Sequence, residues 1–258
     1  MEKAISVANE LGLDCIELRG CWNKNIKDLT NVEVQKIKAM AKRAGLKVIC
    51  ISSPFFKCNI INAKEVKEHL EFLSRVIEIT KLFDSKIVRG FAFWALKNSS
   101  PYWNTVIENL REAADKCGEE GVVLALENEH STFVGTGKES KKAIEEVGSK
   151  NLRLVWDPGN AFCAGDVPYP DGYLQARNYV VHIHLKDAVR DKNTGEVRFV
   201  SVGSGEIDYK GQFEALQKDK YAGCVSIETH YRINNDGEKS TRETCIGLRK
   251  ILHSLQQE

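Results

Sequence analysis

Short apolar runs alternate with longer amphipathic stretches throughout the chain. The runs predict strands, and they lie at residues 15–18, 47–52, 86–89, 122–127, 152–157, 180–184 and 224–228. The amphipathic stretches repeat apolar residues at helical spacing and predict helices near residues 2–12, 31–44, 64–82, 102–120, 138–148, 169–178, 210–218 and 237–255. This alternation is typical of strand–helix units that build a parallel sheet.

The pattern contains one more helix than strands. An α/β barrel begins with a strand, whereas this chain begins with an amphipathic stretch from Glu2 to Leu11. We therefore predict one α/β domain, residues 1–258, with the fold of a (βα)8 TIM barrel that lacks its first strand. Because unpaired strand edges are normally covered or paired, we expect that an N-terminal segment was lost or that another chain covers the gap.

Four of the apolar runs end in a side chain that can bind a metal. These residues are Glu127, Asp157, His184 and Glu228, separated by 30, 27 and 44 residues. A strand and its crossover helix take about 30 residues, so each side chain belongs to its own parallel strand. The C-terminal strand ends of a barrel converge on one face, which predicts that the four meet around one divalent cation.

The longest of these intervals contains residues 191–209, which we predict to be a loop over the site. Gly203 and Gly205 allow backbone conformations that other residues avoid, and Asp208 is placed to cap the next helix.

Composition and charge exclude several classes of protein. Lys and Arg total 37 against 36 Asp and Glu, and no basic block exceeds short pairs, so nucleic acid is not expected as a partner. The N-terminus has no apolar secretory core and no run reaches membrane-spanning length, so we expect a cytoplasmic protein without a membrane partner. The eight cysteines form no C-x-x-C pair, which excludes the usual structural zinc sites.

The chemistry of the four strand-end side chains limits which metal ions they could bind. Oxygen ligands with one imidazole favour Mn²⁺, with Mg²⁺, Co²⁺ or Zn²⁺ as alternatives. Such an ion stabilises the negative charge that develops when the carbon beside a carbonyl loses a proton. Moving that proton needs positioned bases, and Glu127 and Glu228 are the candidates.

Neighbouring polar residues are candidates for substrate binding. Strand alternation places His182, His184 and Lys186 on one side, so we expect Lys186 to reach a substrate hydroxyl or phosphate at the mouth. For His182 an interior hydrogen bond that orients its neighbours is favoured over metal ligation, so it is kept outside the ligand set and is a candidate for substrate binding. Glu17 fits either substrate contact or a buried ion pair.

The motifs together resemble the xylose isomerase-like sugar phosphate isomerase and epimerase superfamily of TIM barrels. The resemblance spans nearly the whole chain and is carried by Leu-Ala-Leu-Glu-Asn at 124–128, Trp-Asp-Pro-Gly-Asn at 156–160, His-Ile-His-Leu-Lys-Asp at 182–187, the Gly-Ser-Gly-Glu-Ile-Asp loop and the segment 221–230. Residues 13–20 look like this superfamily's second strand, which agrees with a missing first strand.

The resemblance implies a metal-dependent isomerase or epimerase that forms an enediolate on a small carbohydrate or keto-polyol, as a possible homodimer. The ketose 3-epimerase branch places its metal ligands at Glu127, Asp157, His184 and Glu228. It also places an arginine six residues after the metal histidine, which is Arg190 here, and a histidine three residues after the metal aspartate, where this chain has Asn160. Because Asn160 is not a charged donor, sugar 3-epimerisation itself is less favoured.

Three alternatives stay open. A lyase of the inosose dehydratase type would expel a β-hydroxyl from the same enolate, with Lys186 or His130 as the acid. An endonuclease IV-like phosphodiesterase would need more histidines at strand ends than the six in this chain supply. A non-catalytic sugar-binding barrel would bind a ligand without exchanging its protons.

Overall fold

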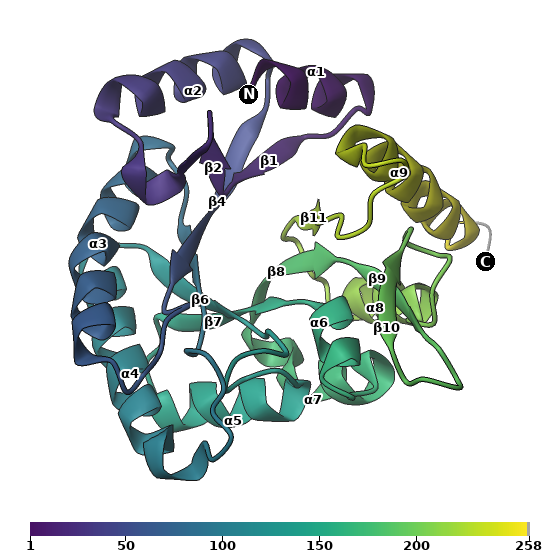
Figure 1. Ribbon diagram of the computed structural model, residues 1–258. Coiled ribbons are helices and arrows are strands. Elements are labelled where there is room, and N and C mark those ends of the chain that lie inside the picture. Colours follow the sequence, from purple (N-terminus) through teal and green to yellow (C-terminus); the bar gives the residue numbers. More distant parts are fainter. Residues whose placement is uncertain (257–258) are drawn as a thin grey trace.

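Seven parallel strands curve into an almost closed barrel with helices on the outside (Figure 1). The computed structural model describes residues 1–256. The sheet runs in the order β1 (Cys15–Leu18), β4 (Lys47–Phe55), β5 (Ile87–Gly90), β6 (Val123–Glu127), β7 (Leu152–Trp156), β8 (Val180–Leu185) and β11 (Val225–Ile227). Each predicted strand is present within a few residues of its expected limits, and the prediction of a TIM barrel that lacks one strand is confirmed.

The helices of the outer layer follow the predicted order. They are α1 (Glu2–Glu10), α2 (Asn31–Arg43), α3 (Ala63–Leu82), α4 (Trp103–Glu119), α5 (Gly137–Val147), α6 (Pro158–Cys163), α7 (Tyr173–Ala176), α8 (Tyr209–Lys218) and α9 (Gly237–Ser254). The helix predicted at 169–178 is instead a π-helical turn at Pro168–Gly172, the short α7 and a 3-10 turn at Arg177–Tyr179. α6 was not predicted, because six residues are too few to show helical periodicity.

Two small antiparallel hairpins accompany the barrel. β2 (Gly20–Cys21) pairs with β3 (Lys24–Asn25), and β9 (Asp187–Arg190) pairs with β10 (Val197–Val200). The second hairpin occupies part of the stretch that we expected to be a loop, so that expectation was wrong for 197–200. Asp208 does cap α8, since its carboxylate accepts from the Gly211 N–H at 2.9 Å.

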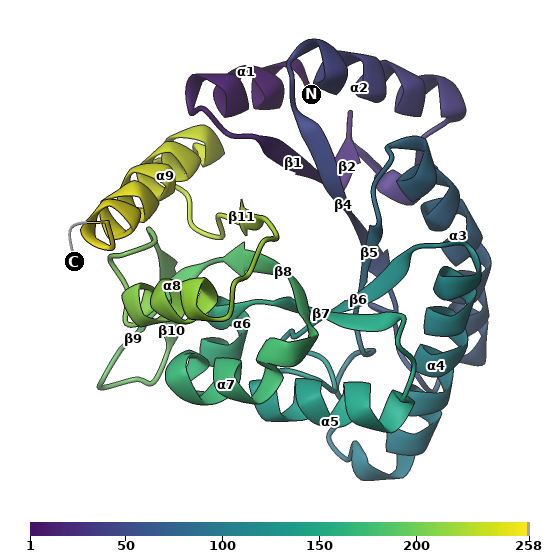
Figure 2. The same ribbon diagram turned by 180° about the vertical axis from the view of Figure 1, so that it is seen from behind.

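The barrel is open between its two edge strands, β1 and β11. Among residues 1–256 no strand pairs with the free edge of either, and the opening is visible between β1 and β11 (Figure 2). A cavity of about 1510 Å³ lies at this seam, lined by residues of α1, β1, β11 and α9, and it reaches Glu17 and His184 inside the barrel. The position of the seam is the one that the surplus N-terminal helix predicted.

Side-chain alternation along the strands separates an apolar outer core from a polar interior. On β8, Ile183 and Leu185 pack into the hydrophobic core, while His182 and His184 are buried on the other side. The helices press apolar faces onto the sheet, as Ile37 does from α2. Each such side chain stabilises the fold by about 1.5–3 kcal/mol when fully buried. The outer core therefore offsets the cost of burying polar side chains inside the barrel.

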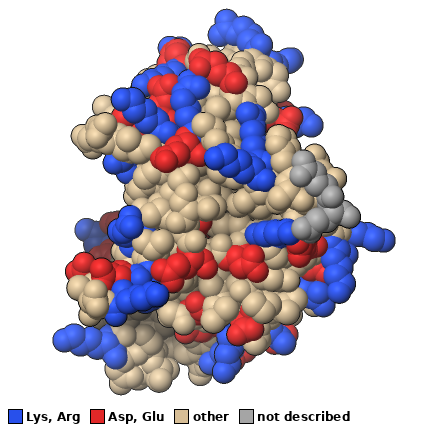
Figure 3. Space-filling view, turned by 90° about the vertical axis from the view of Figure 1, so that its right-hand side faces the viewer, with Lys and Arg blue, Asp and Glu red and all other residues tan. Residues whose placement is uncertain are grey.

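Charge on the surface is mixed rather than segregated. On the face shown in Figure 3, Lys and Arg side chains are interspersed with Asp and Glu, in keeping with the net charge of +1. In the described part of the chain, no helix has both the length and the apolar character that a bilayer span requires.

Candidate metal centre

The four strand-end side chains singled out in the sequence meet inside the barrel. Glu127, Asp157, His184 and Glu228 each offer one ligand atom, and these four atoms lie within 4.8 Å of one another. They come from β6, β7, β8 and β11, which are neighbours in the sheet. The side chains of the first three are at most 2% exposed, and that of Glu228 is 29% exposed. The group is therefore open on the side of Glu228.

Hydrogen bonds from the Asn128 side chain to the Asp157 backbone fix the ends of β6 and β7 relative to each other. Asn128 accepts from the Asp157 N–H through Oδ1 (2.8 Å) and donates through Nδ2 to the Asp157 carbonyl (2.9 Å). Asp157 then caps α6, since its Oδ1 accepts from the Asn160 N–H at 2.8 Å. The capping bond uses one carboxylate oxygen and leaves Oδ2 toward the centre.

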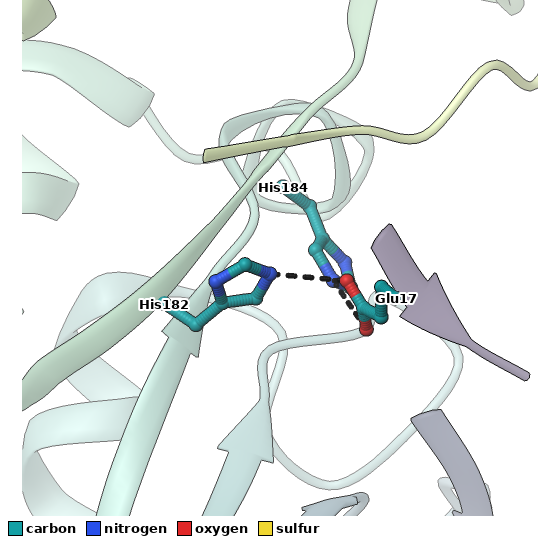
Figure 4. Close-up of side chains that lie close together, drawn as sticks. All are labelled: Glu17, His182 and His184. Atoms are coloured by element: carbon teal, nitrogen blue, oxygen red, sulfur yellow. Dashed lines mark hydrogen bonds and ion pairs between the residues drawn. The ribbon is translucent and has the colours of Figure 1, made fainter. Parts of the chain in front are cut away.

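His184 stands between two sets of carboxylates, one at each ring nitrogen. Nδ1 lies 3.3 Å from Glu127 Oε1, 3.7 Å from Asp157 Oδ2 and 3.4 Å from Glu228 Oε2. Nε2 lies 3.1 Å from Glu17 Oε2 (Figure 4). A ligand histidine commonly binds the metal through one nitrogen and donates from the other to a carboxylate, and this imidazole has that arrangement.

Glu17 and His182 belong to the interior and form the second layer of the centre. His182 Nε2 lies 3.0 Å from Glu17 Oε2 and 2.9 Å from Ser226 Oγ, and the Ser52 hydroxyl also donates to Glu17. Figure 4 shows the Glu17 carboxylate reaching from β1 to both imidazoles. Glu17 thus lies within ion-pairing distance of both imidazoles, and it also lines the cavity at the seam, so substrate contact stays a prediction.

Arg89 is part of this site and was missed in the sequence. It ends the apolar run of β5, and its Nη1 lies 2.7 Å from Glu127 Oε2 with both side chains almost completely buried. Nη2 donates to the Ser52 carbonyl at 3.1 Å. The signal was a charged residue at a strand end, the same signal that found the carboxylates, but only possible metal ligands were searched for.

Lys186 lies at the centre itself rather than at the mouth. Its Nζ is 2.7 Å from Asp157 Oδ2 and 2.6 Å from Glu228 Oε2, and the side chain is 2% exposed. Burial opposes the charged form, but Asp157 and Glu228 raise the pKa of Lys186 above its ordinary value. The amine therefore stays charged at neutral pH.

The charges and donor atoms fit one divalent cation. Four carboxylates, at 17, 127, 157 and 228, face the two cations Arg89 and Lys186, which leaves two negative charges before the imidazoles are counted. Asp157 Oδ2 and Glu228 Oε2 are buried and form no hydrogen bond among residues 1–256, and their cationic partner is the Lys186 ammonium at 2.7 and 2.6 Å. Buried oxygens in that condition are metal-ligand candidates.

The charges at the centre strongly shift the pKa values of two of its side chains, Glu228 and His184. Burial would raise the pKa of Glu228, but the charges of His184 and Lys186 hold it well below its ordinary value. Burial would lower the pKa of His184, but Glu17, Glu127 and Glu228 raise it well above its ordinary value. Glu228 is thus ionised at neutral pH and can accept a proton or bind a cation.

Asn160 and Arg190, expected to contact substrate, lie at different depths. Asn160 is 1% exposed, and its Nδ2 donates to Glu127 Oε1 at 3.1 Å while its Oδ1 lies 3.4 Å from Lys186 Nζ. Arg190 donates instead to the carbonyls of Phe162 and Gly195 and stacks on the Phe162 ring. The structure brings Asn160 to the centre and ties Arg190 to the loops around it.

A second charged group lies at the rim, after β6. His130 Nδ1 lies 2.9 Å from Glu129 Oε1, and Lys57 Nζ lies 2.9 Å from Glu129 Oε2. Burial opposes its ionisation, yet these two cations lower the pKa of Glu129. The hydrogen bond to Glu129 raises the pKa of His130, which is 44% exposed and also interacts with Asn160. The sequence left Glu129 as a loop position and His130 as either a loop position or the acid of a lyase.

Proteins similar to this chain include a dehydratase, a magnesium-bound barrel and a sugar epimerase. An inosose dehydratase of Geobacillus thermodenitrificans (strain NG80-2) is 26% identical over 220 residues, covering 74% of this chain and 72% of the relative. A xylose isomerase-like barrel from Mycobacterium smegmatis, solved in complex with magnesium, superposes with a TM-score of 0.79 at 20% identity, covering 99% and 88% of the two chains. D-psicose 3-epimerase from Clostridium cellulolyticum H10, solved with D-tagatose, gives a TM-score of 0.74 at 18% identity, covering 98% and 92%.

A family match extends over nearly the whole chain. Residues 5–251 match the xylose isomerase-like TIM barrel. That range contains every strand of the barrel and all four strand-end side chains of the centre. The chain therefore belongs to the xylose isomerase-like TIM barrel family.

Proposed function

We propose that this protein is a divalent-metal-dependent enzyme that removes a proton from the carbon beside a carbonyl of a small carbohydrate or keto-polyol. The observation that carries the proposal is the convergence of Glu127, Asp157, His184 and Glu228, whose ligand atoms lie within 4.8 Å of one another. The relatives named as inosose dehydratase and ketose epimerase support the substrate class.

The four residues would hold the ion, with His184 binding through Nδ1. Glu17 would then accept the Nε2–H and fix the ring, with His182 beside that carboxylate and Ser226 Oγ in contact with His182. Three carboxylates and one imidazole suit Mn²⁺ best, with Mg²⁺, Co²⁺ or Zn²⁺ as substitutes. The bound ion would supply positive charge that stabilises the enolate oxygen of the substrate.

Glu228 is the better placed of the two proposed bases. Glu127 is held by Arg89 at Oε2 and by Asn160 at Oε1, and it is 2% exposed. Glu228 is 29% exposed and lines the cavity, so it can reach a carbon atom of a bound substrate. We assign proton abstraction to Glu228 and charge balance to Glu127, whose role as a second base would require Asn160 to move.

Substrate hydroxyls would be oriented by side chains already at the centre. Lys186 and Asn160 offer an ammonium and an amide beside the ligands, and Arg190 on the surrounding loops would contact a more distant part of the substrate. Reprotonation of the enolate gives isomerisation or epimerisation, and loss of a β-hydroxyl gives dehydration. The similarity to inosose dehydratase favours considering the second outcome alongside the first.

The test begins with metal content and ends with proton exchange. The purified chain should bind about one Mn²⁺ after reconstitution, as measured by elemental analysis, and Glu228→Gln should weaken that binding at least about tenfold because it removes a charged ligand. The control is Glu108→Gln, an exposed glutamate of α4.

The Mn²⁺-loaded protein is then incubated in heavy water with an inosose and with D-tagatose. Deuterium should enter the carbon next to the carbonyl of at least one of these probes, and proton NMR detects the loss of that signal. Metal bound at one equivalent without exchange into either probe would contradict the proposed chemistry, whereas no metal binding would contradict the assignment of the centre.

A further inference from the structure

The mouth of the seam carries two arginines that come from opposite sides of the opening. Arg19 directly follows the last residue of β1, and Arg232 lies in the connection between β11 and α9. Both line the cavity of about 1510 Å³ that reaches Glu17 and His184. Figure 2 shows β1 and β11 on the two sides of the opening. The two guanidinium groups therefore border one space that leads to the candidate metal centre.

Arg19 lies nearer the mouth than Glu17, on the same side of the chain. Residues two apart along a strand share a face and are separated by about 6–7 Å. Glu17 points to the interior, where its Oε2 lies 3.1 Å from His184 Nε2. The Ile26 N–H donates to the Arg19 carbonyl at 3.0 Å and fixes the backbone there. Within residues 1–256 the exposed Arg19 side chain forms no hydrogen bond or ion pair, so its guanidinium can bind a ligand.

Arg232 is positioned by the backbone and keeps its charge. Its Nη1 donates to the carbonyls of Thr229 and Tyr231, both at 2.9 Å. The guanidinium lies against the first residue of α9, since a Cβ on Gly237 would be 3.4 Å from Arg232 Nε and 3.5 Å from Cζ. In the described part of the chain no carboxylate forms an ion pair with this arginine. Its other nitrogens therefore remain for a ligand.

The acidic side chains that line the cavity outside the centre do not neutralise these arginines. Asp236 caps α9 and accepts from the Glu238 N–H at 3.0 Å. Glu238 lies 2.8 Å from both Lys3 Nζ and Arg242 Nη2. Asp14 precedes β1 and so lies at the other end of the strand from the centre. The positive charge at the mouth is therefore not balanced from within the cavity.

The centre itself would not repel an anion once a divalent ion is bound. Its four carboxylates exceed Arg89 and Lys186 by two negative charges before the imidazoles are counted, and a divalent ion cancels that excess. Lys186 is held between two carboxylates, and Arg190 donates to backbone carbonyls and is not among the residues that line the cavity. Arg19 and Arg232 are thus the cations best placed to receive an anionic group.

We propose that the substrate carries an anionic group, a phosphate or a carboxylate, at a distance from its carbonyl, and that Arg19 and Arg232 bind this group across the seam. The inference rests on the proposed function, which places the carbonyl at the metal. A guanidinium matches both kinds of anion with paired hydrogen bonds. The cavity also exceeds the about 300–1,000 Å³ of an ordinary small-molecule site, which leaves room for a substrate that extends from the centre to the mouth.

The experiment compares three ketohexoses that differ only at carbon 6. D-tagatose is neutral, D-tagatose 6-phosphate carries a phosphate, and D-tagaturonate carries a carboxylate. Deuterium exchange beside the carbonyl is measured by mass spectrometry with the Mn²⁺-loaded protein. We expect kcat/KM to be at least about tenfold higher for at least one anionic probe than for D-tagatose, because hydrogen bonds to a charged group have about that effect.

The variants assign that preference to the two arginines. Arg19→Gln and Arg232→Gln should each lower kcat/KM for the anionic probe by about 10- to 100-fold, while the value for D-tagatose changes by less than about threefold. The neutral probe thus shows that each variant is folded and active. The control is Arg43→Gln, an exposed arginine at the end of α2, which should change neither value.

A second readout measures binding without turnover. Titration calorimetry of the Mn²⁺-loaded protein should show tighter binding of the anionic probe than of D-tagatose, and the two arginine variants should remove that difference. Added salt should reduce it as well, because exposed charges are screened. A preference for the phosphate alone, for the carboxylate alone or for both identifies which anion the site takes.

The other outcomes separate this inference from the proposed function. Equal exchange into neutral and anionic probes would leave the enolisation standing and overturn the anion site. A preference for the anionic probes that neither arginine variant reduces would also overturn it. If no probe exchanges but an anionic probe binds through Arg19 and Arg232, the proposed function fails and the anion site stands. If there is neither exchange nor selective binding, both fail.

Discussion

Replacing Arg89 by methionine tests how the buried charges of the barrel are balanced. The guanidinium lies 2.7 Å from Glu127 Oε2, and the two side chains are 6% and 2% exposed. Charges about 4 Å apart interact by about 4 kcal/mol at an effective dielectric constant of about 20. Removing one partner of a buried pair typically costs about 3–5 kcal/mol, because the other charge stays buried alone. We expect Arg89→Met to lose stability in that range.

The assay is urea unfolding in EDTA and again with saturating Mn²⁺. In EDTA the free energy of unfolding should fall by the full loss of about 3–5 kcal/mol expected above, because Glu127 is then without its main cation. With Mn²⁺ the loss should shrink by at least about 1 kcal/mol, because the more negative centre binds the ion more tightly and ligand binding adds to the free energy of unfolding. The Arg89→Met, Glu127→Gln double variant should recover most of the loss in EDTA, since it leaves no unpaired charge.

The control is Arg111→Met, which removes an arginine that donates to the carbonyls of Val147 and Glu146. It should lose only about 1 kcal/mol and should not respond to Mn²⁺. A loss below about 1 kcal/mol for Arg89→Met in EDTA would refute the reasoning about the buried pair. A large loss that Mn²⁺ does not reduce would refute its link to the metal centre.

Two further predictions concern stability elsewhere in the barrel. Burial lowers the pKa of His69 to about 4, and its Nδ1 accepts from the Phe56 N–H at 2.8 Å, which requires a neutral ring. Between pH 6.5 and 4 the unfolded chain therefore binds more protons than the folded chain, and the free energy of unfolding should decrease as the pH is lowered through that range. We expect a decrease of about 1–2 kcal/mol, because the ring is only partly buried. Urea unfolding at several pH values should show a smaller fall for His69→Gln, and equal falls would count against it. Gly159→Ala would place a Cβ 2.5 Å from the Lys186 carbonyl, so β8 or α6 must shift. We expect a loss of about 1–3 kcal/mol in thermal or urea unfolding, and a variant as stable as wild type would show that the two elements adapt freely.

The sequence predicted the strands and the four converging side chains because both depend on local pattern. A buried parallel strand is a short apolar run, and the residue after it lies at the C-terminal edge of the sheet whatever the rest of the chain does. That rule placed Glu127, Asp157 and Glu228 correctly in space. The order of the strands followed from the same repeated units.

What the sequence did not predict depends on contacts between distant segments. The pairing of Arg89 with Glu127 joins two strands, and the position of Lys186 between Asp157 and Glu228 depends on three. We expected Lys186 at the mouth, because alternation gives the side of a strand but not the depth that a long side chain reaches. The β9–β10 hairpin was missed since its strands are short and carry little alternation.

Glu17 helps to hold the barrel together at the seam between β1 and β11. The ligand set occupies consecutive strands on one arc of the ring, from β6 to β11, and the opening does not interrupt it. The two ends of the sheet are instead joined by side-chain contacts. Glu17 of β1 contacts the imidazoles of His182 and His184 on β8, and Lys3 of α1 forms an ion pair with Glu238 of α9 at 2.8 Å. The barrel is thus closed at the seam by side-chain contacts rather than by strand pairing, and one of the two imidazoles that Glu17 contacts, His184, is also a ligand of the proposed ion.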